Sequence, residues 1–263
     1  MIVSAIVPCF NEEKTVRKVV TTLLANPKID EVIVVNDGST DESLTELNKF
    51  EQQIKLINLK QNRGKGWALT EGIKQAQGEL VMFIDADLVN LNQKKILALL
   101  KPILDHHYRG VIGIRKKSRL LPAPLAKLSG ERVYYKKDLL PILDQMKRAR
   151  FGVEILLNHS FNNKSVKKIS LLKLHGLGKY EKRTPALAVK EYLEEGVEIA
   201  KELARQEKLK AEDLKIIERL KNVASFKELK EIVAKISNLK IREYLQKYVL
   251  NYLGKARTWW QKW

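Results

Sequence analysis

The chain has 263 residues, of which 44% are hydrophobic, and a formal net charge of +18 at pH 7. This length and apolar content fit a packed α/β domain with a smaller addition, and they exclude a chain that is mainly disordered. The single cysteine, Cys9, excludes an internal disulfide framework and fits a reducing compartment. We expect Cys9 to be a small buried hydrophobic residue rather than a nucleophile, since no histidine lies near it in the sequence.

The positive charge is concentrated in the middle of the chain. Residues 115–183 hold 18 Lys or Arg against 5 Asp or Glu. Such a segment is expected to face an anionic partner. Nucleotide and sugar phosphates, an acidic acceptor, an anionic membrane surface and nucleic acid all fit, and charge alone does not choose among them.

The first residues form a strand-like run and lack the basic region, long apolar core and cleavage site of a secretory signal. No stretch reaches the roughly eighteen apolar residues that a membrane-spanning helix needs. We therefore expect a cytoplasmic location, with any membrane contact peripheral and on the cytoplasmic face.

Short apolar runs alternate with helical patterns through the first half of the chain. The predicted strands are Ile2–Val7, Glu31–Val35, Ile54–Leu59, Leu80–Ile84 and Gly110–Ile114, and the predicted helices are Glu12–Ala25, Asp41–Phe50, Gly66–Gln75 and Gln93–Leu104. This alternation predicts an α/β fold with a mostly parallel sheet and helices on both faces. The polar loops after the strands should then gather at one edge of the sheet.

From Pro185 the composition changes to helical patterns rich in Lys, Glu, Leu and Ala. Thr184 before Pro185 is typical of a helix start, with Thr at the cap and Pro in the first turn. We therefore expect two domains, an α/β domain over residues 1–184 and a helical appendage over residues 185–263.

The appendage is expected to hold about four helices, interrupted near Gly196, Asn222–Ser225 and Asn238. It ends in aromatic residues mixed with Lys and Arg, among them Trp259, Trp260 and Trp263. An amphipathic helix at a membrane interface has this composition. Packing of the same segment onto the α/β domain or onto a second subunit of a homodimer is the alternative.

Two carboxylates, Asp85 and Asp87, follow the apolar run Leu80–Ile84. The carboxyl ends of strands in parallel sheets are where ligands bind. Two acidic side chains in a dry site are stabilised by a cation, and hard oxygen ligands favour Mg²⁺ or Mn²⁺ with substrate phosphates as further ligands. We therefore expect a metal site here, with a solvated turn as the alternative.

The other strand ends carry polar loops. V-P-C-F-N-E-E follows the first strand from Val7, N-D-G-S-T-D follows the second from Asn36, and N-R-G-K-G-W-A-L follows the third from Asn62. Asp37 is placed to accept hydrogen bonds from a base or ribose. Lys65, flanked by two glycines at a helix start, offers free amides and a cation to a phosphate.

In this order and at these spacings, the four loops resemble those of the family 2 glycosyltransferases of the GT-A fold. The strong motifs cover roughly residues 1–115. One departure is Asn36, where the family more often has Asp; Asp37 is retained.

The resemblance implies a nucleotide-sugar donor, such as a UDP- or GDP-sugar, and a divalent metal. The positions that would hold the nucleoside match Pro8, Glu12 and Asp37. Lys65 would lie near the base or the diphosphate, and Asp85 and Asp87 would serve ribose and metal. Charge neutralisation of the leaving diphosphate by the metal agrees with this assignment, and Asp87 is its catalytic candidate.

Two later segments, Ser129–Arg132 and Phe151–Ile155, look like acceptor-side segments of relatives of glucosyl-3-phosphoglycerate synthase and of polyprenyl-phosphate sugar synthases. The match implies that Glu154 faces the acceptor or the sugar, as a second catalytic candidate; pairing with a nearby Arg or Lys is the alternative. The resemblance also makes His175 a candidate third metal ligand, and another alignment places Glu181 there.

The favoured function is thus metal-dependent sugar transfer to a phosphate-bearing acceptor, either a polyprenyl phosphate or a small soluble acid. A haloacid-dehalogenase-type phosphohydrolase with Asp85 as nucleophile is an alternative, but it leaves the other loops unexplained. A non-enzymatic basic protein that binds membrane or nucleic acid is suggested only by charge. The chain has no recognisable nucleic-acid-binding motif, so we expect no nucleic-acid partner.

Overall fold

The computed structural model describes residues 1–116, 128–162, 165–207, 209, 211–223, 225–250 and 253. It forms two compact units, the sheet unit (Met1–Arg150 with Leu157–Leu177) and the helical unit (Phe151–Leu156 with Gly178–Trp263). The sequence placed a domain boundary after residue 184. The helix at Pro185 begins where expected, but the residues between Gly178 and that helix, and Phe151–Leu156, belong to the helical unit.

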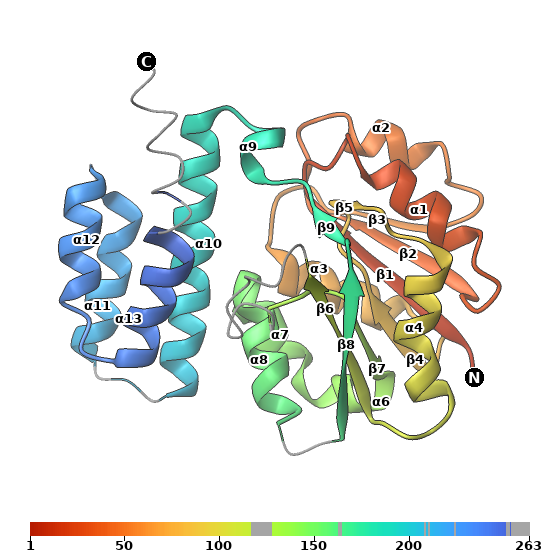
Figure 1. Ribbon diagram of the computed structural model, residues 1–263. Helices are drawn as coiled ribbons and strands as arrows, with labels where there is room; N and C mark the ends of the chain where they lie inside the picture. The colour runs from red at the N-terminus through yellow and green to blue at the C-terminus, as the bar shows by residue number, and fades with distance from the viewer. Residues whose placement is uncertain are drawn as a thin grey trace. The chain divides into compact units, whose positions relative to one another are not determined.

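A seven-stranded sheet with the order β3-β2-β1-β4-β7-β6-β8 forms the centre of the sheet unit (Figure 1). Its strands are β1 (Val3–Cys9), β2 (Glu31–Asn36), β3 (Lys55–Asn58), β4 (Leu80–Phe83), β6 (Gly110–Lys116), β7 (Arg132–Tyr135) and β8 (Val166–Leu172). Strands β1 to β4 are parallel, and β8 is parallel to β6. Strand β7 is antiparallel to both of its neighbours, so the sheet is mostly parallel, as predicted.

Helices cover both faces of the sheet (Figure 1). One face carries α1 (Val16–Leu24), α2 (Ser43–Asn48) and α4 (Gln93–Leu104), whose apolar side chains share one core cluster with Ala5 and Val7 of β1. The side chain of Ile6 points to the other face, because residues alternate along a strand. There it meets Gly72 of α3 (Lys65–Gln75), where an added Cβ would lie 2.5 Å from Ile6 Cγ2.

Three further helices follow β7 in the chain, namely α6 (Lys136–Leu139), α7 (Leu143–Ala149) and α8 (Val153–Ser160). Helix α7 packs against α3, and the backbone O of Met146 lies where a Cβ on Gly66 would be, 2.0 Å away. Gly66 therefore allows the first turn of α3 to approach α7 closely.

A second, two-stranded sheet pairs β5 (Leu88–Val89) antiparallel with β9 (His175–Gly176). Strand β5 begins directly after Asp87, and the Leu177 N–H donates to the Asp87 backbone O at 3.0 Å. This small sheet therefore brings residues 175–177 next to the end of β4.

The helical unit contains α9 (Lys179–Lys182), α10 (Pro185–Gln206), α11 (Ala211–Arg219), α12 (Phe226–Ala234) and α13 (Leu239–Leu245). Ser225 and Asn238 cap α12 and α13, which confirms two of the expected interruptions. The interruption expected at Gly196 is wrong, because α10 continues through it. A Cβ there would lie 2.4 Å from Val249 Cγ2, so this glycine permits close packing instead.

In the described part of the chain, none of the helices combines the length and the apolar character that crossing a membrane requires. The expected interfacial segment with Trp259, Trp260 and Trp263 lies outside the described residues.

Candidate active site

The loop after β2 is fastened to the loop after β3 by Asp37. Its Oδ1 accepts the Arg63 backbone N–H at 2.7 Å, and its Oδ2 accepts the Gly64 N–H at 2.7 Å. Asp37 is only 3% exposed, and burial raises its pKa although the two amides oppose this effect. Each carboxylate oxygen retains a second lone pair that a further hydrogen-bond donor can use.

The loop after β1 is fastened to the loop after β2 by Asn11, which has a φ of 55°. Its Oδ1 accepts the Thr40 N–H at 2.7 Å, and its own N–H donates to Ser39 Oγ at 2.9 Å. The Glu12 N–H donates to Ser43 Oγ at 2.7 Å. The partly exposed Glu12 is therefore held at the same edge of the sheet as Asp37.

Pro8 lies in β1 and pairs with Val35 of β2, the strand that precedes the loop with Asp37. It is partly exposed, in contrast to the buried residues on either side of it. Cys9 follows it and is buried, and burial raises the pKa of its thiol to about 12. The expectation of a buried cysteine is confirmed.

Lys65 and Asp85 form an ion pair across the site, with Lys65 Nζ 2.6 Å from Asp85 Oδ1. The other oxygen of Asp85, Oδ2, accepts a hydrogen bond from Nη2 of Arg115 in β6. Burial by itself would raise the pKa of Asp85, but the charges of Lys65 and Arg115 outweigh it and lower this pKa to about 2. Asp85 is therefore ionised throughout the physiological range.

Asp87 lies between Arg115 and the small β5–β9 sheet. Its Oδ1 is 3.9 Å from Arg115 Nη1, and a Cβ on Gly176 would lie 2.2 Å from its Oδ2. A Cβ on Gly130 would likewise lie 2.3 Å from Asp85 Oδ1. Two glycines thus let the backbone approach both carboxylates, whose side chains remain 19% and 24% exposed at Asp85 and Asp87.

The chemistry of Asp85 and Asp87 fits a hard divalent cation, since both offer carboxylate oxygens at the end of a buried strand. The described residues contain no group of three or more His, Cys, Asp or Glu that could hold a metal ion. The role expected for His175 as a third metal ligand stays a prediction. His175 pairs with Val89 in the β5–β9 sheet, and its Nδ1 is 3.2 Å from the Lys173 backbone O.

Glu154 lies in the part of α8 that belongs to the helical unit, and it is 6% exposed. There it is close to Tyr244, whose phenol pKa is raised by burial first and then by the charges of Glu195 and Glu154. The alternative position for a metal ligand, Glu181, accepts the backbone N–H of Gly178 in the same unit. The roles expected for Glu154 and Glu181 at the metal or acceptor stay predictions.

A family model described as "Glycosyl transferase family 2" matches residues 4–169. The chain belongs to glycosyl transferase family 2. The family resemblance based on the four loops is therefore confirmed, and the phosphohydrolase alternative with Asp85 as nucleophile is not retained.

Curated relatives match a part of this family 2 chain. The poly-beta-1,6-N-acetyl-D-glucosamine synthase of Staphylococcus epidermidis is 30% identical over 165 residues, covering 52% of this chain and 40% of the relative. The synthase of the same name from Staphylococcus aureus is 28% identical over 163 residues, with the same coverage. The chain thus spans less than half the length of these curated relatives.

Solved structures confirm the GT-A fold of the family 2 chain. Glucosyl-3-phosphoglycerate synthase from Mycobacterium tuberculosis, in complex with phosphoglyceric acid, has a TM-score of 0.61 at 23% identity, covering 78% of this chain and 79% of that chain. The same synthase in complex with Mn²⁺, UDP and phosphoglyceric acid has a TM-score of 0.60 at 23% identity, covering 78% of each chain.

Sequence reasoning did not single out two charged residues of this family 2 site, Arg115 and Glu131. Arg115 Nε donates to Glu131 Oε2 at 2.7 Å, and Glu131 is fully buried. Glu131 lay within a segment that the resemblance had marked as acceptor-side. The local signal was a charged residue, Arg115, at the end of an apolar strand. Its partner Glu131 is 16 residues away, and a local pattern does not reveal a pairing over that distance.

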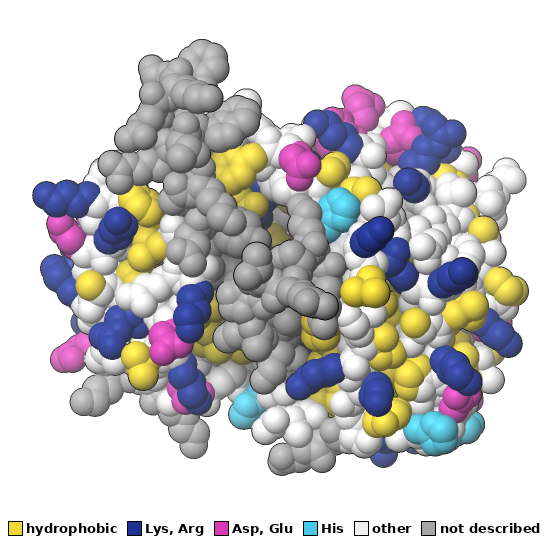
Figure 2. Space-filling model, in the orientation of Figure 1, with side chains coloured by type: hydrophobic (Ala, Val, Ile, Leu, Met, Phe, Trp, Pro, Cys, Tyr) yellow, Lys and Arg dark blue, Asp and Glu magenta, His cyan; other side chains and the backbone are white. Residues whose placement is uncertain are grey.

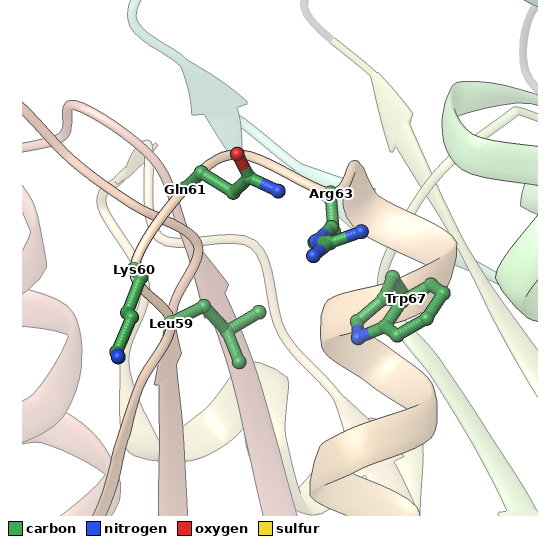
Figure 3. A pocket seen from close by; sticks show the side chains of 5 residues that line it. All are labelled: Leu59, Lys60, Gln61, Arg63 and Trp67. Atoms are coloured by element: carbon green, nitrogen blue, oxygen red, sulfur yellow. The ribbon is translucent and has the colours of Figure 1, made fainter.

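A pocket of about 440 Å³ lies beside the loop that Asp37 fastens, and it is lined by Leu59, Lys60, Gln61, Arg63 and Trp67. Figure 3 shows Arg63 between Gln61 and Trp67, with Leu59 directed toward the same space. The Arg63 guanidinium lies 5.3 Å from the centroid of the Trp67 ring. This pocket follows the end of β3, and its lining does not include Asp85 or Asp87.

Proposed function

We propose that the protein transfers a sugar from a nucleotide-sugar donor to a phosphate-bearing acceptor, with Mg²⁺ or Mn²⁺ as cofactor. The observation that carries this proposal is the cluster of Asp85, Asp87 and Lys65 beside the loop that Asp37 fastens. Family membership supports it, because the matched region contains all four of these residues.

In the proposed donor complex, Asp37 accepts a hydrogen bond from the nucleoside while Pro8 and Glu12 form the neighbouring wall. Asp85 and Asp87 would hold the cation, which supplies Lewis-acid stabilisation of the leaving diphosphate when it is bound. Lys65 adds a second positive charge at the N-terminus of α3, where free backbone amides favour phosphate. Positive charge directed at a leaving group stabilises the transition state more than the ground state.

The proposed acceptor carries a phosphate, and the charge of the chain supports this choice. Figure 2 shows many Lys and Arg side chains on the face that carries β8 and α4. Lys167, Lys168 and Lys173 are exposed on or next to β8. The similar synthase was crystallised with phosphoglyceric acid and with glycerol 3-phosphate, and both of these molecules carry a phosphate.

A polyprenyl phosphate and a small soluble acid are both consistent with this chemistry. For the first, we propose a cytoplasmic protein that contacts the anionic face of a membrane through its basic surface and its Trp-containing terminus. An already ionised phosphate needs no strong general base, whereas a hydroxyl acceptor needs one in an inverting mechanism. Glu154 would be the candidate for that base.

The test is binding of UDP-, GDP-, ADP- and dTDP-sugars by calorimetry and thermal shift, each with Mn²⁺, Mg²⁺ or EDTA. We expect stabilisation by one nucleotide class that depends on the metal and is lost in Asp87→Ala. Asp105→Ala is the matched control, because Asp105 is an exposed carboxylate paired with Lys101. Absence of binding by every nucleotide-sugar, or undiminished binding in Asp87→Ala, would contradict the proposal.

Acceptor choice is tested next, with the identified donor and radiolabelled sugar. Phosphoglyceric acid, a short polyprenyl phosphate and an oligomer of N-acetylglucosamine represent the three classes. The last is included because the curated relatives are poly-N-acetylglucosamine synthases. Transfer to the oligomer alone would contradict the phosphate-bearing acceptor and leave the donor site intact.

A further inference from the structure

One arginine side chain faces three carboxylates at the candidate metal site. Arg115 Nη2 donates to Asp85 Oδ2 and to Glu131 Oε1, and Nη1 lies 3.9 Å from Asp87 Oδ1. The Arg115 side chain is 22% exposed, so it is not fully enclosed in the core. Arg115 therefore places a positive charge next to both predicted metal ligands.

The contacts of Arg115 with Glu131 and with Asp85 differ in how deeply they are buried. Arg115 Nε donates to Glu131 Oε2 at 2.7 Å, and Glu131 has no exposed side-chain surface. Ser129 Oγ donates to the same carboxylate, and the Gly113 N–H donates to the Glu131 backbone O at 2.8 Å. Removal of this pairing would leave a buried charge without compensation, whereas the partly exposed Asp85 end can exchange its partner at lower cost.

We propose that Arg115 is a resident counter-ion of Asp85 which a divalent cation must displace, while the Arg115–Glu131 pair persists. This inference rests on the proposed function, since it concerns the cation that the transferase would use. It makes Arg115 a positioning residue: it orients Asp85 before the cation binds, and it lowers the affinity for that cation.

The physical reason is competition for the same oxygens. A carboxylate oxygen that accepts a charge-assisted hydrogen bond has less electron density available for a metal, and the guanidinium charge repels an incoming cation. Lys65, which forms an ion pair with Asp85 Oδ1, competes with a cation for that oxygen in the same way. Arg115 differs from Lys65 because its rigid fork faces Asp85 and Asp87 together and is anchored on a third carboxylate.

The experiment measures Mn²⁺ binding to the full chain by electron paramagnetic resonance, without any donor. We expect Arg115→Met to bind Mn²⁺ about twofold to fivefold more tightly than the wild type, the ratio that corresponds to losing one partly exposed competing charge pair. Glu131→Gln should bind Mn²⁺ more weakly, because the negative charge of Glu131 then no longer offsets the positive charge of Arg115 next to Asp85. A merely structural role of Arg115 predicts weaker binding in both variants.

Arg109→Met is the matched control for the loss of one positive charge. Arg109 precedes the same strand, is exposed, and pairs with Asp138 rather than with Asp85. Its Mn²⁺ affinity should change by less than about twofold, because exposed charges at a distance are screened. An equal gain in Arg109→Met and Arg115→Met would overturn the proposal, since it would show only an effect of net charge.

Arg115→Lys keeps the proposal testable if Arg115→Met fails to fold. Lys retains the charge but loses the fork, so its Mn²⁺ affinity should lie above that of the wild type. In addition, ¹⁵N resonances of the Arg115 side chain should respond differently to Mg²⁺, with Nη shifting and Nε unchanged. Unchanged Nη resonances at saturating Mg²⁺ would overturn the displacement.

Failure of this inference can be distinguished from failure of the proposed function. Mn²⁺ binding that depends on Asp87 but is insensitive to Arg115 contradicts the counter-ion role only. Mn²⁺ binding that is equally strong in Asp87→Ala places the cation elsewhere and contradicts the metal site itself.

Discussion

The Asp37 carboxylate binds the Gly64 backbone N–H at 2.7 Å, and this contact joins the loop after β2 to the N-terminus of α3. Gly64 has a φ of 94°, a conformation that residues with a side chain rarely adopt. Its N–H lies just before a helix whose first amides lack partners within the helix. Asp37 therefore holds the backbone next to Lys65, in addition to the nucleoside role proposed for it.

Asp37→Asn should weaken both the fold and donor binding. The amide nitrogen of Asn is a donor, so the N–H of Arg63 or Gly64 loses its acceptor. We expect the free energy of unfolding to fall by about 1–3 kcal/mol, the cost of leaving a buried polar group unsatisfied. Thermal unfolding measures the loss, and calorimetry with the nucleotide-sugar measures the affinity.

Asp41→Asn is the control for the Asp37 variant. Asp41 also accepts backbone N–H groups, from Ser43 at 3.0 Å and from Glu13 at 3.2 Å, but it does not contact Gly64. Its substitution should leave donor affinity unchanged. Equal losses of affinity in both variants would show that Asp37 acts only as a general support of the loops.

Cys9 should not react with thiol reagents in the folded protein at pH 8. It is 1% exposed and burial raises its pKa to about 12, so the thiol is both covered and neutral. Because Cys9 is the single cysteine, the release of thionitrobenzoate from Ellman's reagent reports on it alone. Reaction in guanidinium chloride but not in buffer is the expected result, and stoichiometric reaction of the folded protein would contradict it.

The same shift gives a sign to the pH dependence of stability. The pKa of Cys9 is higher in the folded state than its ordinary value of 9.0, so the unfolded state releases its proton first as the pH rises. The stability linked to Cys9 is therefore complete below about pH 9 and declines toward pH 12. Cys9→Ala should show a smaller decline over this interval in chemical unfolding experiments.

The fold of the first half was predictable because each of its elements has a local pattern. The predicted bounds of α4, Gln93–Leu104, coincide with those in the structure. Buried parallel strands are short apolar runs, and the polar loops after them must meet at one edge of the sheet. These two rules suffice to gather Asp37, Lys65, Asp85 and Asp87.

The antiparallel strand β7 could not be predicted in this way. Its first residue, Arg132, is fully buried, and its guanidinium donates to Tyr134 Oη at 3.1 Å and to Asn158 Oδ1 of α8 at 3.0 Å. A local pattern shows an arginine as a surface residue, whereas its burial depends on a partner from a distant segment. The Arg115–Glu131 pair escaped prediction for the same reason.

Replacement of Trp259, Trp260 and Trp263 by Ala should weaken binding to vesicles that contain anionic lipid, if the terminus contacts a membrane as proposed. Indole side chains are favoured at the interface between headgroups and acyl chains, and neighbouring Lys and Arg add attraction to anionic lipid. Co-sedimentation with phosphatidylserine vesicles measures the effect, with phosphatidylcholine vesicles as the control. Unchanged sedimentation of the variant would favour packing of this segment within the protein or onto a second subunit.

Gly176→Ala should impair the metal site through Asp87. A Cβ at position 176 would lie 2.2 Å from Asp87 Oδ2, so either β9 moves away from β5 or the Asp87 carboxylate turns. Such overpacking costs typically 1–3 kcal/mol. We expect a lower melting temperature together with weaker Mn²⁺ binding, because the displaced carboxylate is a predicted metal ligand.

Gly178→Ala provides a matched comparison from the same glycine-rich segment. Its added Cβ would first meet Glu181 Oε2, at 3.0 Å, which is the end of a flexible side chain that can move aside. The Gly178 variant should therefore keep the Mn²⁺ affinity of the wild type. If Gly176→Ala also kept that affinity while losing stability, the Asp87 carboxylate would be free to adjust, and Gly176 would matter for strand pairing alone. If both properties changed in Gly176→Ala only, the β5–β9 sheet would position the metal ligand.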